Sequence, residues 1–306
     1  MNFTQINERI KQYEEALKTG EMDMTEATSL VKEALDDYTA TDDAIVHFKD
    51  YKVPEGLGRN HIPSNIPELD EMIGGFGKGD LQLIIGDTSD GKTTFARFLI
   101  RKFTEQDRKS LVFSYEETNE EFLSKFVGEL PDGYIPKVLT TKSLVWIEAK
   151  ILESKELYGT EIIFIDNLAA IIDHESRRNE VGEVDRIVQT LKAIAIKHNV
   201  VIFLLAHPKK SDTGLIDRNS VSGSKMTVNT ASIAIALWRN RDKQTKKELE
   251  EFGIKYNNYC NFYLVKNRYK SIYNHFTMLF HPDKGIYTSR PQDTIVSEED
   301  IKIDFN

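Results

Sequence analysis

The segment that most constrains the fold of this chain is the stretch GDTSDGKT at residues 86–93. It has the spacing G-x-x-x-x-G-K-T, follows an expected strand at 81–85 and opens an expected helix. Glycines at both ends permit a tight turn, while the backbone N–H groups of the loop and the helix behind them attract phosphate. A chance glycine-rich turn is the alternative, and the full spacing with both flanks disfavours it. We therefore predict a phosphate-binding loop that binds ATP, or another nucleoside triphosphate, with Mg²⁺.

The positions of this loop have separate predicted roles. We expect Lys92 to reach the β- and γ-phosphates and the Thr93 hydroxyl to ligate Mg²⁺, with Thr94 as a reserve hydroxyl. The residues expected to contact the nucleotide are Gly86, Asp87, Thr88, Ser89, Asp90, Gly91, Lys92, Thr93 and Thr94.

Short apolar runs alternate with helical patterns from about residue 64 onward. The expected strands are LQLIIG, SLVFSY, EIIFID, VVIFLLAH, ASIAIALW and NFYLVKN, and the expected helices are TTFARFLIRKFTEQ, EFLSKFVGEL, TKSLVWIEAKILESKEL and GEVDRIVQTLKAIAIKH. Nearly continuous β-rich runs are typical of parallel strands that are buried on both faces. The pattern predicts an α/β fold around one mainly parallel sheet.

Two of these strands end in acidic residues. Asp166 closes EIIFID, a Walker B pattern, and there it would hold Mg²⁺ directly or through water. An N-cap or turn aspartate is the alternative. Glu116 follows SLVFSY and could polarise an attacking water as a general base. Because acidic residues after strands are common in loops, the pattern alone leaves a plain loop role open for Glu116.

The first 56 residues have a different sequence pattern from the rest of the chain. Apolar residues recur at helical spacing at 6–17 and 27–34, which predicts two amphipathic helices that must pack on the core or on another subunit. The cluster Pro54, Gly56, Gly58 and Pro63 is typical of a linker. We divide the chain into a helical extension and linker at 1–56, expected to contact another subunit, a main domain at 57–290 and an acidic tail at 291–306.

Composition excludes several classes of protein. With 40% apolar and 29% charged residues, no window approaches the run of about 18 apolar residues that a membrane span needs. We find no secretory signal and expect a cytoplasmic protein of a bacterial cell or a virus-infected host cell. The net charge of −9 argues against a wholly nucleic-acid-attracting surface but permits a local basic lining. Cys260 is the only cysteine, which excludes intrachain disulfides and multi-cysteine metal sites.

The order of these motifs resembles the RecA-like ATPase domain of hexameric replicative DNA helicases of the DnaB and Twinkle type. IPSNIPELDEMIGGFGKGDLQLIIG, SYEET and FIDNLAAI match in order, and the resemblance covers about residues 60–290. It implies a RecA-like P-loop core in which Glu116 is the catalytic base and Asp166 the Walker B aspartate. His207 opens HPKK, the form closest to the Twinkle-like branch, at the position of a γ-phosphate sensor. A lone histidine after a strand is otherwise more often structural.

The resemblance also implies a DNA-contacting loop around an S-G-S core. The family commonly carries an arginine just before this core, whereas this chain has Ser220 and Val221 there. Phosphate contacts need donors rather than a particular sequence, which favours Lys225 and the backbone near the glycine. The implied DNA-binding residues are Arg218, Ser222, Gly223, Ser224 and Lys225.

The stretch YLVKNRYKS resembles the K-x-R strand end that, in this family, projects into the nucleotide of the neighbouring subunit. Lys266 and Arg268 take these positions. The planar, permanently charged fork of arginine suits the charge that develops on the γ-phosphoryl oxygens. An exposed basic strand end is the alternative.

The resemblance as a whole implies an ATP hydrolase coupled to DNA unwinding. We expect a homo-oligomeric ring, with a hexamer as the family's form, that moves 5′ to 3′ along single-stranded DNA and works with a primase or helicase loader. The alternatives are a RecA- or RadA-like recombinase, which forms filaments, and a KaiC-like regulatory ATPase or helicase loader. Only analogy, and no physical feature of the residues, favours the helicase over the recombinase.

Overall fold

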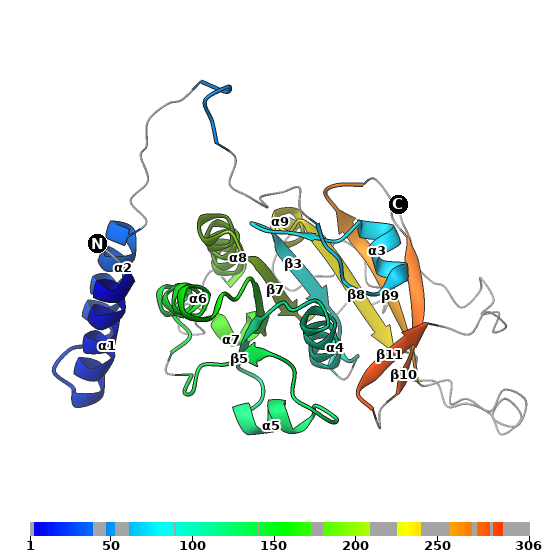
Figure 1. Cartoon of the computed structure of the whole chain (residues 1–306), viewed down its shortest axis with the longest axis horizontal. Helices are drawn as coiled ribbons and strands as arrows, with labels where there is room; N and C mark the ends of the chain where they lie inside the picture. Colours follow the sequence, from blue (N-terminus) through cyan, green and yellow to red (C-terminus); the bar gives the residue numbers. More distant parts are fainter. Residues whose placement is uncertain are drawn as a thin grey trace, which may run out of the picture.

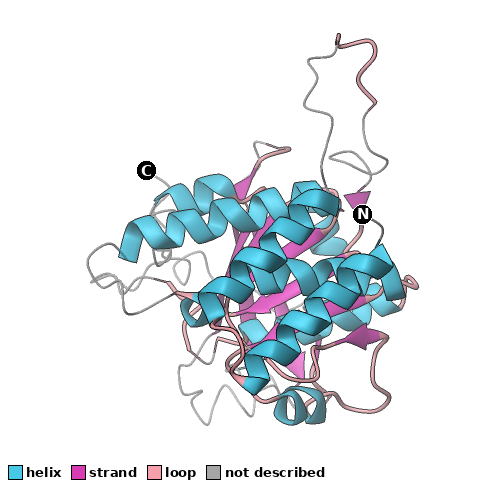
Figure 2. Ribbon diagram, turned by 90° about the vertical axis from the view of Figure 1, so that its left-hand side faces the viewer, coloured by secondary structure: helices cyan, strands magenta, loops and turns pink. Residues whose placement is uncertain are grey.

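The computed structural model describes residues 3–38, 47–52, 61–88, 90–139, 141–172, 180–208, 225–239, 258–270, 274–281 and 284–289. A central sheet with helices on both faces dominates the molecule (Figures 1 and 2). The strands of this sheet are β3 (Leu81–Ile85), β4 (Ser110–Ser114), β5 (Gly133–Tyr134), β6 (Ile162–Asp166), β7 (Val201–Ala206), β8 (Ile233–Arg239), β9 (Tyr259–Asn267), β10 (His275–His281) and β11 (Ile286–Ser289). A separate antiparallel pair joins β1 (His61–Ile62) and β2 (Phe76–Gly77).

The strand order is β11-β10-β9-β8-β3-β7-β6-β4-β5. The run from β8 to β5 is parallel, and β9, β10 and β11 extend it as antiparallel strands. Every residue of β3, β4, β6 and β7 is buried, as their continuous apolar runs require. Each of the six expected strands is present, so the predicted α/β fold with a mainly parallel sheet is confirmed.

Helices cover both faces of this sheet. On one face, α3 (Pro67–Ile73) and α4 (Lys92–Thr104) form a core with the aromatic side chains of the antiparallel strands, and the rings of Phe95 and Phe262 lie 4.7 Å apart. On the other face, α6 (Leu144–Tyr158) and α8 (Glu180–His198) cover the parallel strands. The short helix α7 (Leu168–Ile171) lies between β6 and α8, and the short helix α9 (Lys225–Thr230) lies between β7 and β8.

The helix expected at 121–130 is shorter and begins earlier. It is α5 (Asn119–Ser124), and it starts at Thr118 because the Thr118 side chain accepts from the backbone N–H of Glu121 while the Glu121 carboxylate accepts from the N–H of Thr118. Further along, Gly128 has a φ of 81°, a left-handed conformation that no helix can include. The apolar pattern therefore continues into a turn, where it no longer indicates a helix.

The N-terminal helices α1 (Phe3–Thr19) and α2 (Met24–Tyr38) form a hairpin at the left of Figure 1. Its apolar side packs on α6, where the buried Ile6, Ile10 and Leu35 form a small core with two residues of that helix. Lys150 of α6 adds an ion pair to Glu14 at 2.9 Å. Residues 39–46, 53–60 and the expected tail at 291–306 lie outside the described residues.

Candidate functional site

The phosphate-binding loop connects β3 to α4, as predicted. Gly91 stands at the start of α4 with a φ of 94°, and a Cβ there would come 2.8 Å from the Tyr287 hydroxyl, so only glycine fits. The buried Asp90 holds the loop from inside, because its carboxylate accepts from the backbone N–H of Asp87 at 2.9 Å. Lys92 folds back over the loop and donates to the carbonyl of Asp87 at 3.1 Å.

Lys92 is buried at the centre of an acidic site. Burial lowers the pKa of its ammonium group, and the negative charges of Glu116 and Asp166 oppose that effect. A ligand with several negative charges would supply the partner that such a buried cation needs.

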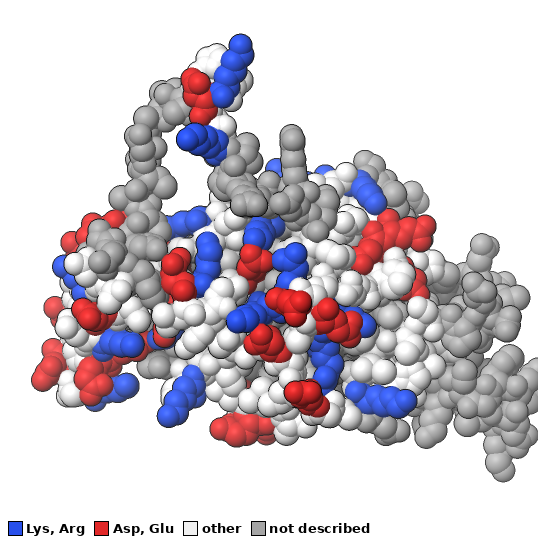
Figure 3. All heavy atoms as spheres, viewed as in Figure 1, with Lys and Arg blue, Asp and Glu red and all other residues white. Residues whose placement is uncertain are grey.

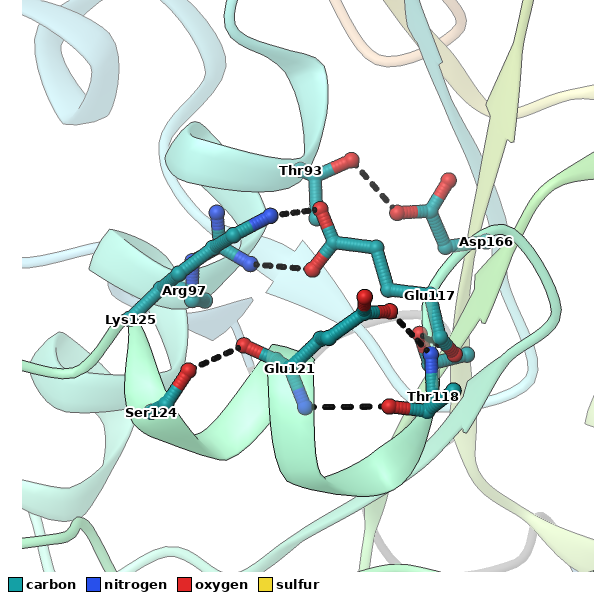
Figure 4. A network of polar contacts seen from close by, with 9 residues as sticks. Thr93, Arg97, Glu117, Thr118, Glu121, Ser124, Lys125 and Asp166 are labelled. Atoms are coloured by element: carbon teal, nitrogen blue, oxygen red, sulfur yellow. Dashed lines mark hydrogen bonds and ion pairs between the residues drawn. The ribbon is translucent and has the colours of Figure 1, made fainter.

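Asp166 at the end of β6 lies directly beside the first turn of α4 (Figure 4). The Thr93 hydroxyl donates to its Oδ2 atom at 2.6 Å, while its Oδ1 atom has no partner among the described residues although Asp166 is only 2% exposed. Burial raises the pKa of Asp166 to about 6, helped by the nearby charges of Glu116 and Glu117 and opposed by the Thr93 hydrogen bond and the charge of Lys92.

A buried carboxylate oxygen without a partner, next to a threonine hydroxyl, fits a Mg²⁺ ion. Mg²⁺ prefers hard oxygen ligands and is commonly held by one or two protein groups together with phosphates and water. Within the described part of the chain, no group of three or more His, Cys, Asp or Glu is placed to hold a metal ion. Thr93 and Asp166 are therefore the residues that could hold the ion.

Glu116 and His207 follow β4 and β7, and the parallel sheet brings them together. His207 Nε2 lies 3.1 Å from Glu116 Oε1, and His207 Nδ1 lies 3.3 Å from Lys92 Nζ. Because the carboxyl ends of parallel strands meet at one edge of a sheet, residues far apart in sequence form one cluster there. The structure thus gathers the predicted residues Lys92, Thr93, Glu116, Asp166 and His207 at the same edge.

Asn167 is a member of this cluster that sequence reasoning missed. Its side-chain amide donates to Glu116 and lies 3.1 Å from His207 Nε2. The only signal in the sequence was its place directly after Asp166, and that place does not by itself reveal which way the side chain points.

A second missed feature ties α4 to the segment that carries Glu116 (Figure 4). Arg97 of α4 donates to Glu117 Oε2 at 3.2 Å, and Lys125 donates to Glu117 Oε1 at 2.5 Å. Arg97 is 7% exposed, its guanidinium lies 5.2 Å from the centre of the Phe122 ring, and burial lowers its pKa. The helix behind the phosphate loop is therefore joined to the neighbour of the predicted base.

A cavity of about 220 Å³ opens beside the phosphate loop. Strands β8 to β11 supply its far wall, where the guanidinium of Arg239 lies 5.4 Å from the centre of the Phe280 ring. Its lining residues are Asp90, Gly91, Thr94, Arg239, Cys260, Phe280 and Tyr287. A planar cation and aromatic rings next to a phosphate site suit the flat ring of a nucleobase. No pattern in the sequence indicates this cavity, since its walls come from distant strands.

The predicted K-x-R residues lie at the opposite edge of the sheet. Lys266 pairs with Ala234 near the start of β8, whereas the phosphate loop lies near the end of that strand. At about 3.3 Å per residue, the length of β8 separates them from Lys92 of the same chain. Lys266 donates to the carbonyl of Asn229 in α9, and Arg268 is exposed. The structure therefore does not bring Lys266 and Arg268 to the site of their own chain.

The chain is similar to known proteins both in sequence and in fold. Residues 61–132, which include the phosphate loop and Glu116, match the family model of the DnaB-like helicase C terminal domain. Among solved structures, one ATPase domain matches with a TM-score of 0.64 and 18% identity over 88% of this chain and 99% of that one. A DnaB-like replicative helicase, whose interactions with primase were also described, matches with a TM-score of 0.64 and 18% identity over 94% of this chain and 76% of that one.

The chain has the RecA-like fold that these ATPase domains share. Among curated proteins, this RecA-like chain is 25% identical to the replicative DNA helicase DnaB of Geobacillus stearothermophilus over 228 residues, which is 62% of the chain and 50% of that protein. It is also 25% identical to the DNA repair protein RadA of Listeria monocytogenes over 152 residues, 49% of the chain and 32% of RadA. The chain thus matches half or less of the length of these two relatives.

Some predicted site residues of the RecA-like domain lie outside the described residues, namely Ser89, Arg218, Ser222, Gly223 and Ser224. Lys225 begins α9, and its DNA-binding role stays a prediction. The face drawn in Figure 3 interleaves acidic and basic side chains over the described part of the chain. None of the helices described is long and apolar enough to cross a membrane.

Proposed function

We propose that this chain is an ATP-driven DNA helicase of the replicative type. The observation that carries the proposal is the gathering of Lys92, Thr93, Glu116, Asp166 and His207 at one sheet edge, in a fold shared with DnaB-type ATPase domains. The cavity beside the phosphate loop adds space for a base, so a whole nucleotide has a place.

In this proposal each residue has one task in hydrolysis. Lys92 and the loop N–H groups hold the β- and γ-phosphates, and Glu116 takes a proton from the attacking water. Thr93 and Asp166 would hold Mg²⁺, which when bound would offset the negative charge of the phosphates. His207 detects the γ-phosphate through its position between Lys92 and Glu116.

The proposed working form is a homo-oligomeric ring, expected to be a hexamer, that moves 5′ to 3′ on single-stranded DNA. Support comes from the position of Arg268, which is exposed and lies at the end of the sheet opposite the site of its own chain. The proposed DNA contacts are Arg218, Ser222, Gly223, Ser224 and Lys225. Primase and a helicase loader are the proposed partners, since one structural relative was described with its primase interactions.

Unwinding of a forked DNA duplex tests the proposal. Wild type should unwind with ATP and Mg²⁺, Lys92→Ala and Arg268→Ala should each lose activity, and the exposed Lys137→Ala should behave as wild type. Mixing the two inactive variants should restore part of the activity, because an intact phosphate loop on one subunit then meets an intact Arg268 on the next. No recovery, or normal DNA-stimulated hydrolysis by Arg268→Ala, would show that Arg268 does not act between subunits.

A recombinase is the second candidate, because the RadA of Listeria monocytogenes matches almost half of the chain. Strand exchange between homologous duplexes without unwinding of the fork would favour it. Hydrolysis that ignores single-stranded DNA would instead favour a regulatory ATPase or helicase loader.

The N-terminal hairpin is proposed to contact another subunit. It docks through an apolar face on α6, and the 22 residues at 39–60 are long enough, at up to about 75 Å when fully extended, for the same face to dock on a neighbouring copy. Deletion of residues 1–50 should then weaken the ring in native mass spectrometry. A ring of unchanged stability would refute this role.

A further inference from the structure

The side chain of Asn167 uses both ends of its amide. Its Oδ1 atom accepts from the backbone N–H of Ala170 at 3.1 Å, as the N-cap of α7, and its Nδ2 atom donates to Glu116 Oε1. A backbone N–H can only donate, so the oxygen of the amide must face Ala170 and the nitrogen must face the carboxylate. Asn167 is 2% exposed and is fixed in this orientation.

The proton on His207 can be placed by the same reasoning. Lys92 Nζ lies 3.3 Å from His207 Nδ1, and a lysine ammonium group has no acceptor, so Nδ1 must accept. The proton of the neutral ring is then on Nε2, which lies 3.1 Å from both Glu116 Oε1 and Asn167 Nδ2. Because Nδ2 already donates to Oε1, both nitrogens direct a hydrogen to that oxygen. Oε1 of Glu116 thus accepts two hydrogen bonds, one from a histidine that also contacts the phosphate-loop lysine and one from Asn167.

We infer that Asn167 is a positioning residue that holds the carboxylate of Glu116 while His207 changes partners. This inference rests on the proposed ATP hydrolysis. When phosphate occupies the donors of Lys92, the contact of Lys92 with His207 Nδ1 is lost and the ring becomes free to turn. No hydrogen bond joins Asn167 to Lys92 in the described part of the chain, and Asn167 stays attached to α7 through Ala170, so its hold on Glu116 persists.

Exposure explains why Glu116 needs such a hold. The side chain of Glu116 is 38% exposed and that of His207 is 29% exposed, so either one can rotate into solvent. A general base works only when it is held near the proton that it abstracts, and small displacements cost large factors in rate. Of the groups that donate to Glu116 Oε1, Asn167 is the buried one.

The N-cap role and the positioning role can be separated by substitution. Serine at position 167 keeps an oxygen for the N–H of Ala170 and lacks the Nδ2 donor. Asn167→Ser should therefore retain more of the wild-type thermal stability than Asn167→Ala, which loses the cap as well. In ATP hydrolysis, Asn167→Ser should lower kcat about 10- to 100-fold and leave KM within about twofold.

Carbodiimide labelling of carboxylates, read by mass spectrometry, supplies a second measurement that needs no activity. Asn167→Ser should raise labelling of Glu116 several-fold in the nucleotide-free protein and leave the exposed Glu120 unchanged. Wild-type kcat in Asn167→Ser, or unchanged labelling of Glu116 in that variant, would overturn the positioning role. If wild type hydrolyses ATP no faster than Lys92→Ala, the proposed function fails, while the labelling still tests whether Asn167 holds Glu116.

Discussion

Replacing Asp166 by asparagine should stabilise the nucleotide-free protein while abolishing hydrolysis. The carboxyl is 2% exposed, one of its oxygens has no partner among the described residues, and burial raises its pKa from the ordinary 3.8 to about 6. A raised pKa means that the folded state binds the proton more tightly than the unfolded state does. The contribution of Asp166 to the stability of the wild type is therefore fully present below pH 3.8 and is lost as the pH rises through 6.

The size of this loss follows from the pKa difference. At about 1.4 kcal/mol per pKa unit, ionised Asp166 costs the fold about 3 kcal/mol at pH 8. Asparagine avoids that cost and can still accept from Thr93, but its amide nitrogen lacks a known acceptor, which costs about 1 kcal/mol at every pH. We expect Asp166→Asn to be about 2 kcal/mol more stable than wild type at pH 8, with a gap about 1.5 kcal/mol smaller at pH 5.

Urea denaturation at pH 5 and pH 8, in EDTA and without nucleotide, measures this gap. The exposed Asp132→Asn is the matched control and should give no pH-dependent difference from wild type. With Mg²⁺ and nucleotide present the order should reverse, because wild type then gains more from the ligand. A gap for Asp166→Asn that stays constant between pH 5 and pH 8 would refute the electrostatic account of the site.

Three further perturbations test other parts of the molecule. Lys192→Met breaks a buried ion pair with Asp80, whose nitrogen and oxygen lie 3.0 Å apart, and should cost about 3 kcal/mol in urea denaturation; a cost below about 1 kcal/mol would contradict the pair's importance. Leu35→Ala, at a site 1% exposed, should cost the N-terminal hairpin about 3 kcal/mol and speed amide hydrogen exchange in α1 and α2, whereas equal acceleration in α8 would show that the hairpin is not a separate unit. Arg239→Ala should raise KM for ATP and leave kcat unchanged if the cavity holds the base, and an unchanged KM would remove Arg239 from base binding.

Much of the fold followed from local patterns in the sequence. The strands ending at Ile85, Asp166 and Ala206 are continuous apolar runs, and such runs are typical of strands buried on both faces whatever their neighbours are. The phosphate loop is likewise local, because its glycines, lysine and threonine act within eight consecutive residues. Glu116 and His207 could be placed at strand ends, and parallel strands bring such ends to one edge.

Other features depend on which helices and strands pack against one another, and local sequence patterns do not predict that packing. The antiparallel strands place Arg239, Phe280 and Tyr287 beside the phosphate loop, although these residues lie more than a hundred positions after it. The N-terminal helices required a partner by their amphipathic pattern, but only the tertiary structure assigned α6 of the same chain to that role.

The sequence by itself determined that this chain has a phosphate-binding loop in an α/β fold, with acidic and polar residues at the ends of the strands. Only the tertiary structure decided how those side chains meet. It directed Asn167 toward Glu116, and it joined Arg97 to Glu117. The physical reason is that strand periodicity and loop geometry arise from adjacent residues, whereas hydrogen bonds between side chains depend on the position of every element packed around them.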